Sequence, residues 1–466
     1  MASLLTKDDL TEDQRAALDY INLFLDGPNR SMVLCGAAGT GKTSLINVLL
    51  DELDELDLYK YVCTAPTNKA VEVIASKTGR DFDKTIYSIC GLTVKDDDDQ
   101  TPTLVRENES HLNDYTLVFI DEASMVSTQL FYTIEEDMAM FPKVKVIYIG
   151  DMCQIPPVDD TNKGMTDSIV FQLPLKFELT KVMRQALDNP ILKTVTTLRE
   201  NLDSVYDMFD HTTEVNNDGF GVYFYDTQAD FMDKMYDYFC SKEYEDDSDY
   251  AMAVAYTNKA VDAINAHVRA KRYPGVTEDY IKGEELRVAR PYRRDAKRKV
   301  GKKVKEVQET IYTLEERVKV IDAIPCKDPQ YDLESYKMTV CNYRASARTR
   351  KTSLVYVLKP SEKQKYWELR NQMAKEAYEK MKELGRGGRH KYTKSEAWKE
   401  YNELKNYYLE VGYVYGMTAH RSQGTTVQNV FVVEKNIDRI PETIYRNKLK
   451  YTAFTRASKE LHILPS

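Results

Sequence analysis

The sequence predicts an α/β protein with two units that each contain a parallel sheet, and three observations support this fold class. Over the first 200 residues, short apolar runs typical of buried strands alternate with helical patterns. A glycine-rich loop, GAAGTGKT at 36–43, stands between the first such run and a helical pattern. A second series of strand and helix patterns begins near Asn201.

Length and composition are those of a globular protein with more than one domain. The chain has 466 residues, of which 42% are hydrophobic and 30% charged, too long for one ordinary core. No apolar run approaches the roughly 20 residues that span a bilayer, so we expect no membrane segment. The start, MASLLTKDDLTEDQ, lacks the basic and apolar parts of a secretory signal. We therefore expect a cytoplasmic protein, in the host cytoplasm if the gene is carried by a phage.

The cysteines and the distribution of charge bear on which classes of protein are excluded and on a nucleic-acid partner. Seven cysteines are scattered and never spaced as CxxC, which argues against a disulfide framework or a zinc module. The net charge is −9, yet the charges are segregated along the chain. Acidic residues concentrate at 96–99 and 243–249, and ten Lys and Arg residues lie between Arg287 and Lys305. That basic run is either a solvated surface or a nucleic-acid patch.

Four strands are expected in the first unit, which we place at residues 1–200. They are the apolar runs Ser31–Cys35, Lys60–Thr64, Leu117–Ile120 and Val144–Ile149. Between the second and third of them, residues 91–113 are polar and acidic, as expected of an insertion rather than a strand of the sheet.

The second unit is expected at 201–283 and 410–466, because its patterns stop and then resume. Its strand candidates are Tyr250–Ala255, Val430–Val433 and Leu461–Leu464, and its clearest helix is Lys259–Ala270. The stretch between, 284–409, differs in kind. Alternating runs at about 284–353 suit a small β-barrel, and about 361–409, broken by GRGGR at 385–389, suits two antiparallel helices. The segment TNKAV occurs at 67–71 and again at 257–261, which hints at two related lobes.

The loop at 36–43 is the strongest local indication of chemistry. Glycines let backbone N–H groups curl around phosphate oxygens, and the following helix adds a favourable dipole. Lys42 is expected to reach the β and γ phosphates of a nucleoside triphosphate, and Thr43 to bind Mg²⁺. The residues expected to form this phosphate cradle are Gly36, Ala37, Ala38, Gly39, Thr40, Gly41, Lys42 and Thr43.

Polar groups that could take part in nucleotide hydrolysis follow two further strands of the predicted sheet. Asp121 and Glu122 follow the run Leu117–Ile120. Asp121 is expected to hold Mg²⁺, and Glu122 to orient or deprotonate the water that attacks the γ-phosphate. Gln154 lies in GDMCQIPP at 150–157 and could contact the γ-phosphate and transmit its loss to the neighbouring lobe.

Eight segments in order resemble the motifs of the superfamily 1 helicases. They are LTEDQ at 10–14, GAAGTGKT, TAPTNKAV at 64–71, DEAS at 121–124, GDMCQIPPV, LTKVMRQ at 179–185, TAHRSQGTTV at 418–427 and YTAFTRA at 451–457. The resemblance covers nearly the whole chain and is closest to the Dda-like phage helicases. It implies two RecA-like lobes, a small insertion in the first, and an SH3-like barrel plus a helical tower inserted in the second.

The resemblance also implies the roles of individual residues around ATP and Mg²⁺. Gln14 would read adenine, because an amide can both donate to and accept from the base edge. Arg184 and Arg456 match the arginines that neutralise charge at the γ-phosphate. Gln423 and Gly424 match the motif that couples the nucleotide state to the bound strand.

The partners implied by the resemblance are single-stranded and forked DNA. Hydroxyls, amides and backbone can hold phosphates without reading sequence. The residues expected to contact the strand are Pro66, Thr67, Asn68, Thr85, Ser88, Thr418 and His420. In Dda-like enzymes a hairpin in the first insertion splits the duplex, whereas the region here reads VKDDDDQTPTLVRE and has no aromatic residue.

The implied activity is ATP-driven movement 5′ to 3′ on single-stranded DNA with unwinding of duplex, in phage DNA replication or recombination. We expect a monomer, and by analogy a single-stranded-DNA-binding protein as a partner. An RNA helicase, or a translocase that unwinds DNA weakly, stays open because backbone contacts distinguish DNA from RNA poorly. A nucleotide-dependent switch or kinase would not need Arg184, Gln423 and Arg456 around a second α/β unit.

Overall fold

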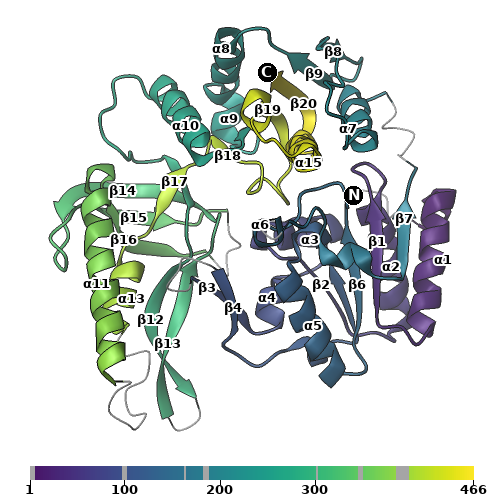
Figure 1. The fold of residues 1–466 in the computed structure, drawn as a ribbon, viewed down its shortest axis with the longest axis horizontal. Helices are drawn as coiled ribbons and strands as arrows, with labels where there is room; N and C mark the ends of the chain where they lie inside the picture. Colours follow the sequence, from purple (N-terminus) through teal and green to yellow (C-terminus); the bar gives the residue numbers. More distant parts are fainter. Residues whose placement is uncertain are drawn as a thin grey trace. The chain divides into compact units, whose positions relative to one another are not determined.

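The computed structural model describes residues 6–96, 102–161, 164–181, 188–300, 303–344, 350–384 and 398–466. The chain divides into two compact units, Met1–Arg272 with Tyr415–Ser466, and Tyr273–Val414. The first unit contains two mainly parallel sheets, which define lobe 1 and lobe 2 (Figure 1). The second contains an antiparallel sheet and a pair of helices. No helix in these described ranges is long and apolar enough to cross a membrane.

Lobe 1 is built on a parallel sheet with the strand order β2-β5-β6-β1-β7. Its strands are β1 (Ser31–Gly36), β2 (Tyr61–Thr64), β5 (Leu117–Ile120), β6 (Lys145–Gly150) and β7 (Lys176–Leu179). The first four match the runs expected from sequence. The fifth, β7, was not expected, because its residues KFEL alternate charged and apolar and it lies at the edge of the sheet.

Both faces of this sheet are covered, because alternate strand residues join different apolar cores. Leu34 and Phe119 pack with α1 (Glu12–Asp26), α2 (Lys42–Leu56) and α3 (Asn68–Thr78). Val33 and Val118 pack with α4 (Ile86–Ile89) and α5 (Thr128–Met140) on the other face. A short helix, α6 (Val158–Thr161), follows β6. The phosphate loop therefore joins a strand that is buried from Met32 to Gly36 to a helix whose buried residues run from Leu45 to Leu53.

The expected insertion in lobe 1 is a hairpin, β3 (Leu92–Asp96) and β4 (Pro102–Arg106), which forms its own two-stranded sheet. Arg106 anchors it, since its guanidinium is 2.6 Å from the fully buried carboxylate of Asp137 in α5. Residues 97–101, part of the acidic stretch, lie outside the described residues.

Lobe 2 contains a six-stranded sheet with the order β18-β10-β19-β20-β9-β8. Its strands are β8 (Glu214–Val215), β9 (Gly221–Phe224), β10 (Ala251–Ala255), β18 (Gly416–Thr418), β19 (Val427–Val433) and β20 (Ala457–Leu464). All pairs are parallel except β8 with β9. The helices are α7 (Pro190–Glu200), α8 (Gln228–Phe239), α9 (Lys242–Asp246), α10 (Asn258–Arg272), α14 (Glu434–Ile437) and α15 (Thr443–Phe454).

Two helices, α7 and α15, cover one face of this sheet and share its apolar core. On the other face, Phe231 and Phe239 of α8 contact Phe431 of β19 edge to face and tilted. The residues of α7, which were expected in the first unit, thus pack against the second sheet. Every residue from Asn447 to Phe454 in α15 is buried, including Lys448 and Lys450.

The second unit contains a five-stranded antiparallel sheet with the order β16-β15-β14-β11-β17. The strands are β11 (Glu285–Val288), β14 (Arg317–Lys327), β15 (Glu334–Cys341), β16 (Thr352–Leu358) and β17 (Val411–Tyr413). A separate hairpin is formed by β12 (Tyr292–Val300) and β13 (Lys303–Tyr312). One isolated bridge joins Tyr356 of β16 to Tyr408, close to the start of β17. The region expected to be a small barrel is therefore antiparallel β structure.

The expected helical pair consists of α11 (Lys363–Leu384) and α13 (Lys399–Tyr407). Near the end of α11, Lys380 pairs with Glu400 at the start of α13 at 3.2 Å. Near the start of α11, Tyr366 packs with Leu404, which lies later in α13. The two helices therefore run antiparallel. The GRGGR segment lies outside the described residues.

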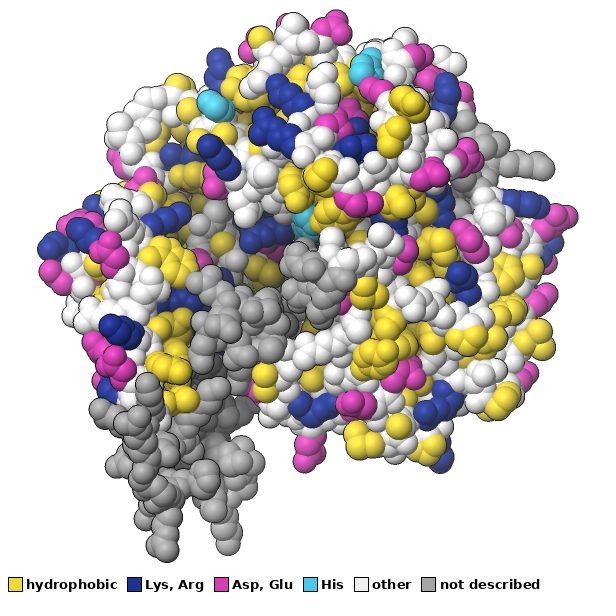
Figure 2. Space-filling view, in the orientation of Figure 1, with side chains coloured by type: hydrophobic (Ala, Val, Ile, Leu, Met, Phe, Trp, Pro, Cys, Tyr) yellow, Lys and Arg dark blue, Asp and Glu magenta, His cyan; other side chains and the backbone are white. Residues whose placement is uncertain are grey.

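Part of the basic run is engaged within the second unit. Arg287 is buried and pairs with Glu315 at 2.8 Å, and Arg290 pairs with Glu410 at 3.2 Å. These two arginines are therefore structural and not part of a free patch. On the face in Figure 2, Lys and Arg side chains are interspersed with Asp and Glu, in keeping with the mixed composition.

Candidate active site

The phosphate loop lies at the carboxyl end of β1, as its sequence requires. Gly39 and Gly41 have φ of 80° and 77°, in the left-handed region that other residues adopt with strain. A Cβ on Gly36 would come within 2.7 Å of the Thr40 hydroxyl. The Lys42 ammonium donates to the carbonyls of Gly36 and Ala37 at 2.7 and 3.0 Å. The lysine thus lies over the loop, at the start of α2, where it could meet phosphate oxygens.

Gln14 supports this loop from behind. Its amide N–H group donates to the carbonyls of Thr40 and Gly41 at 3.3 and 3.2 Å, and its amide oxygen accepts from the N–H of Thr11 at 2.9 Å. The side chain is buried and does not line the cavity described below. Its expected contact with adenine stays a prediction, because both ends of the amide bind the chain's own backbone.

A cavity of about 590 Å³ opens at the loop and is lined by both lobes. This volume falls in the range of small-molecule sites. Lobe 1 contributes the phosphate loop, including Lys42 and Thr43, and the strand-end residues Asp121, Glu122, Asp151 and Gln154. Lobe 2 contributes Gly424, Thr426, Thr455 and Arg456. The structure therefore brings together most of the predicted nucleotide residues, and Arg184 lies outside the described residues.

The two acids of DEAS stand side by side in the cavity. Burial raises the pKa of Asp121, opposed by the hydrogen bond from the N–H of Glu122 and by Lys42. Burial also raises the pKa of Glu122, and the neighbouring Asp121 adds to the effect. Glu122 has φ of 53°, an uncommon conformation for a non-glycine residue that is often found at functional sites. The hydroxyl of Thr43 and the carboxylate of Asp121 are hard oxygen donors of the kind that Mg²⁺ prefers.

Gln154 presents an unused acceptor in the cavity. Its amide oxygen is buried and has no hydrogen-bond partner among the described residues. A buried polar atom without a partner is rare in folded proteins and calls for a ligand or water. The fit of a triphosphate and its attacking water to this site rests on this atom and on the phosphate loop.

Arg456 reaches the cavity from the turn after α15. Its guanidinium donates to the carbonyls of Thr452 at 2.9 Å, Thr425 at 3.3 Å and Ser422 at 3.5 Å, and to the hydroxyl of Thr455 at 2.9 Å. Burial lowers the pKa of Arg456, and the nearby Glu122 opposes this. These acceptors are neutral carbonyl and hydroxyl oxygens, so none of them cancels the positive charge of the guanidinium. A positive group held in this way suits charge that develops on a phosphate.

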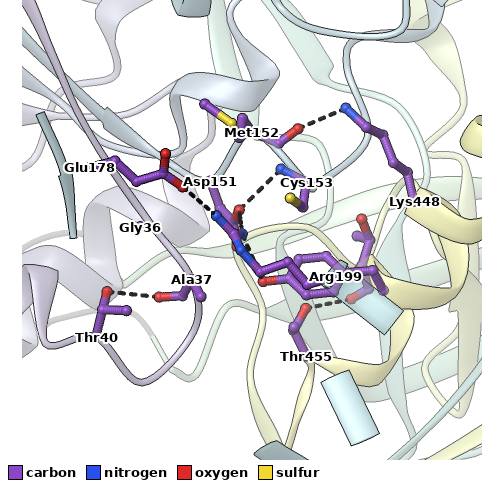
Figure 3. Close-up of polar contacts among 12 residues, drawn as sticks. Gly36, Ala37, Thr40, Asp151, Met152, Cys153, Glu178, Arg199, Lys448 and Thr455 are labelled. Atoms are coloured by element: carbon purple, nitrogen blue, oxygen red, sulfur yellow. Dashed lines mark hydrogen bonds and ion pairs between the residues drawn. The ribbon is translucent and has the colours of Figure 1, made fainter. Parts of the chain in front are cut away.

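Asp151 connects the two lobes beside the phosphate loop (Figure 3). Its carboxylate accepts from Arg199 of α7, from the hydroxyl of Tyr451 in α15 at 2.5 Å and from the N–H of Cys153 at 3.0 Å. Arg199 also pairs with Glu178 of β7 at 3.0 Å. In the sheet, Cys35 of β1 is the register partner of both Gly150 and Glu178. Arg199 therefore spans the strands on either side of β1, just before the phosphate loop.

Other contacts from lobe 2 hold the segment that follows Asp151. The ammonium of Lys448 donates to the carbonyl of Met152 at 2.7 Å. The amide of Gln423 donates to the carbonyl of Ile155 at 2.9 Å, and the hydroxyl of Thr452 accepts from the N–H of Ile155 at 3.2 Å. Gly424, next to Gln423, comes so close to α3 that a Cβ on it would lie 3.3 Å from that of Ala70.

The strand-contact residues predicted in lobe 1 lie at and just before the starts of two helices, α3 and α4. Thr67 and Thr85 cap α3 and α4 with their hydroxyls, which accept from the N–H groups of Ala70 and Ser88 at 3.2 and 3.3 Å. The N–H of Ile86 donates to the carbonyl of Ala65 at 3.1 Å and ties these two regions together. Asn68 and Ser88 are exposed, whereas Pro66 is buried.

The two predicted strand contacts in lobe 2 are less accessible. Thr418 is buried, and its hydroxyl accepts from the N–H of Arg421 at 3.4 Å. His420 contacts the hydroxyl of Tyr445 at 2.6 Å through Nε2. Burial lowers the pKa of His420 to about 4, so the ring is neutral at physiological pH. Contact of either residue with DNA stays a prediction.

Sequence reasoning missed Arg199, Lys448, Tyr451 and Thr452. Tyr451 and Thr452 stand in the YTAFTRA motif, which was recognised only for its arginine. Arg199 and Lys448 have no local pattern that separates them from surface residues of a helix, because their partners are some 50 and 280 to 300 positions distant.

Two family models match parts of the chain, and several known proteins are similar to it. Residues 9–217 match the family model described as an AAA domain, and residues 413–464 match that of the UvrD-like helicase C-terminal domain. The ATP-dependent DNA helicase dda of Enterobacteria phage T4 is 26% identical over 449 residues, which cover 92% of this chain and 93% of that protein. The ATP-dependent RecD2 DNA helicase of Deinococcus radiodurans is 32% identical over 184 residues, or 40% of this chain and 23% of that protein.

Among solved structures, the Pif1 helicase from Candida albicans is 16% identical, with a TM-score of 0.49 and coverage of 98% of this chain and 94% of that one. The likeness to the T4 protein runs through both lobes and the insertion between the halves of lobe 2. The chain belongs to the Dda- and Pif1-like helicases of superfamily 1.

Proposed function

We propose that this protein is an ATP-dependent DNA helicase that moves 5′ to 3′ along single-stranded DNA and unwinds duplex, in phage DNA replication or recombination. The observation that carries the proposal is the cavity lined by both lobes, with the phosphate loop on one side and Arg456 on the other. In such a site, the presence or loss of the γ-phosphate changes what holds the lobes together.

The nucleotide is held by the phosphate loop. Lys42 exchanges its two carbonyl partners for phosphate oxygens, and the backbone N–H groups at the start of α2 face the same oxygens. The hydroxyl of Thr43 and the carboxylate of Asp121 would hold Mg²⁺, which neutralises charge on the transferring phosphoryl group when bound.

Hydrolysis is the work of groups from both lobes. Glu122, held in the cavity beside Asp121, orients the attacking water and accepts its proton. The free amide oxygen of Gln154 can accept a hydrogen bond from that water. Arg456, with Arg184 as its expected counterpart, stabilises the charge that develops at the γ-phosphate.

Movement follows from the change of lobe contacts in each cycle. Closure on ATP brings Gly424 and Arg456 against the loop, and release of phosphate lets the lobes open, so that one lobe advances along the strand. The strand lies on the predicted contacts Pro66, Thr67, Asn68, Thr85, Ser88, Thr418 and His420. The second unit serves as the SH3-like barrel and tower, and the protein works on forked DNA as a monomer, with a single-stranded-DNA-binding protein as a partner.

The switch or kinase alternative is disfavoured by the second lobe. A simple phosphate-loop switch needs no arginine brought from another sheet, yet Arg456 of lobe 2 lines the same cavity as Lys42. A nucleic-acid-stimulated translocase with weak unwinding, or an RNA helicase, is separated from the main proposal by experiment.

The test is strand separation on duplexes with either a 5′ or a 3′ single-stranded tail, in DNA and RNA versions, with Lys42→Ala as the inactive control. Unwinding only from the 5′ DNA tail, lost in Lys42→Ala, supports the proposal. Unwinding from the 3′ tail contradicts the direction, and hydrolysis stimulated by DNA without unwinding supports the translocase. If no nucleic acid stimulates hydrolysis, the motor function is wrong.

A further inference from the structure

Thr452, in the last turn of α15, contacts the segment Asp151–Ile155 of lobe 1 through its side chain. Its hydroxyl oxygen accepts a hydrogen bond from the N–H of Ile155 at 3.2 Å. Both residues are completely buried. Ile155 directly follows Gln154, so this bond fixes the peptide unit that carries the Gln154 backbone carbonyl.

The peptide units on both sides of Ile155 are held from lobe 2. Gln423 donates to the carbonyl of Ile155 at 2.9 Å, so two bonds from lobe 2 pin this one residue. Lobe 1 supplies contacts within the local turn, in which the N–H of Gln154 donates to the carbonyl of Asp151 at 3.2 Å and the N–H of Cys153 donates to the Asp151 carboxylate at 3.0 Å. The position of the Gln154 side chain in the cavity therefore depends on lobe 2.

The backbone of Thr452 has a second partner of the same site. Its carbonyl accepts from Nε of Arg456 at 2.9 Å. One residue of α15 thus contacts the backbone beside Gln154 with its hydroxyl and the guanidinium of Arg456 with its carbonyl. Thr452 is therefore one direct link between the backbone beside Gln154 and the guanidinium of Arg456.

We propose that Thr452 is a positioning residue, whose hydroxyl places Gln154 for ATP hydrolysis only when α15 is docked on the Asp151–Ile155 segment. This inference rests on the proposed function and assigns to the hydroxyl a part in the chemistry that its burial alone does not require. Gln154 comes from lobe 1 by sequence, yet it is oriented by lobe 2, so hydrolysis depends on the contact between the lobes.

The experiment compares variants of the full chain in steady-state ATP hydrolysis with single-stranded DNA. Thr452→Val keeps the shape and removes the acceptor, and Thr452→Ser restores it. Gln154→Ala and the double variant complete a mutant cycle, which isolates coupling between the two positions. Thr197→Val is the matched control, because the Thr197 hydroxyl donates to the carbonyl of Lys193 within its own helix.

We expect Thr452→Val to lower kcat about tenfold with little change in KM for ATP, since misplacing a reacting group by 1 Å can reduce turnover up to about a hundredfold. Thr452→Ser and Thr197→Val should stay within about twofold of the parent. In the Gln154→Ala background, Thr452→Val should lower kcat by less than about threefold. Equal losses with and without Gln154, a change confined to KM, or a serine variant as poor as valine would each overturn the proposal.

A second readout is independent of turnover. Amide exchange of the segment 151–155 should be faster in Thr452→Val than in Thr452→Ser, and unchanged exchange would contradict the positioning role. If the parent itself hydrolyses no ATP in the presence of nucleic acid, the proposed function fails, whereas the exchange experiment still tests the contact.

Discussion

The hydroxyl of Tyr451 in α15 donates to the carboxylate of Asp151 at the end of β6, and this hydrogen bond joins the two sheets next to the phosphate loop. Asp151 is buried and also holds Arg199. Two side chains of lobe 2 therefore satisfy one acid of lobe 1. A buried carboxylate loses much of its hydration, so each bond to it matters more than a bond at the surface.

Tyr451→Phe should lower the free energy of unfolding by about 2 kcal/mol, because it removes one hydrogen bond to a buried charged acceptor and leaves the ring in place. Urea denaturation followed by circular dichroism measures the change. Tyr132→Phe is the control, since the Tyr132 side chain is largely exposed. Equal stability of Tyr451→Phe and the parent would show that Arg199 and the N–H of Cys153 satisfy Asp151 without the tyrosine.

Gly424→Ala should weaken ATP hydrolysis by about tenfold or more, because a Cβ there would press on Ala70 and hold the lobes apart. The residue also has φ of 71°, which by itself strains alanine by about 1 kcal/mol. Gly79→Ala separates the two effects: Gly79 has φ of 65°, and nothing lies within 4 Å of its Cβ position. Similar turnover in both variants would mean that the contact with Ala70 is unimportant.

Glu122→Gln should reduce ATP turnover by about a hundredfold or more, as expected when a general base is lost. It should also raise the melting temperature at pH 8. Burial and Asp121 raise the pKa of Glu122 above 4.5, so the folded state binds more protons than the unfolded state, and stability falls as pH rises through that window. Glu136→Gln, at an exposed site, is the control. A melting temperature below that of the parent would contradict the inference that the buried, charged carboxylate of Glu122 destabilises the folded protein.

His420 should make the protein less stable in mild acid. The pKa of His420 is about 4 in the folded protein, whereas the ordinary value of 6.5 applies to the unfolded chain. As pH falls, the unfolded chain therefore binds a proton first, and stability is lost as pH falls below 6.5. Between pH 7 and 5 the parent should lose about 2 kcal/mol more than His420→Asn. His267→Asn, at an exposed position, is the control variant. A similar pH dependence for His420→Asn and the parent would exclude this role for the burial of His420.

Local sequence was enough for the parts of the site whose chemistry is local. The phosphate loop, Asp121 and Glu122 each follow an apolar strand in the sequence, and the carboxyl ends of parallel strands meet at one edge of a sheet. Their meeting in one cavity could therefore be expected. The strand β7 could not, since a four-residue edge strand with alternating charges resembles a loop.

Partners far apart in the chain were beyond sequence reasoning. The amide of Gln14 has the donor and acceptor that binding to adenine requires. Its burial and its hydrogen bonds to the phosphate loop, however, depend on how α1 packs against that loop. His420 and Thr418 were expected to contact the strand, but Thr418 is buried in β18 and the ring of His420 contacts Tyr445. The assignment of α7 to lobe 1 failed for the same reason, because order along the chain does not say which sheet a helix covers.

The complete burial of α15 from Asn447 to Phe454 limits how this helix can change over evolution. A helix with one solvent-exposed face tolerates substitutions on that face. In α15, by contrast, the side chains from Asn447 to Phe454 are all packed against other parts of the protein. Lys448 with Asp167, Lys450 with Glu434 and Tyr451 with Asp151 are such pairs. Substitutions in this helix are expected to be accepted in pairs, and single changes to be rejected at nearly every position.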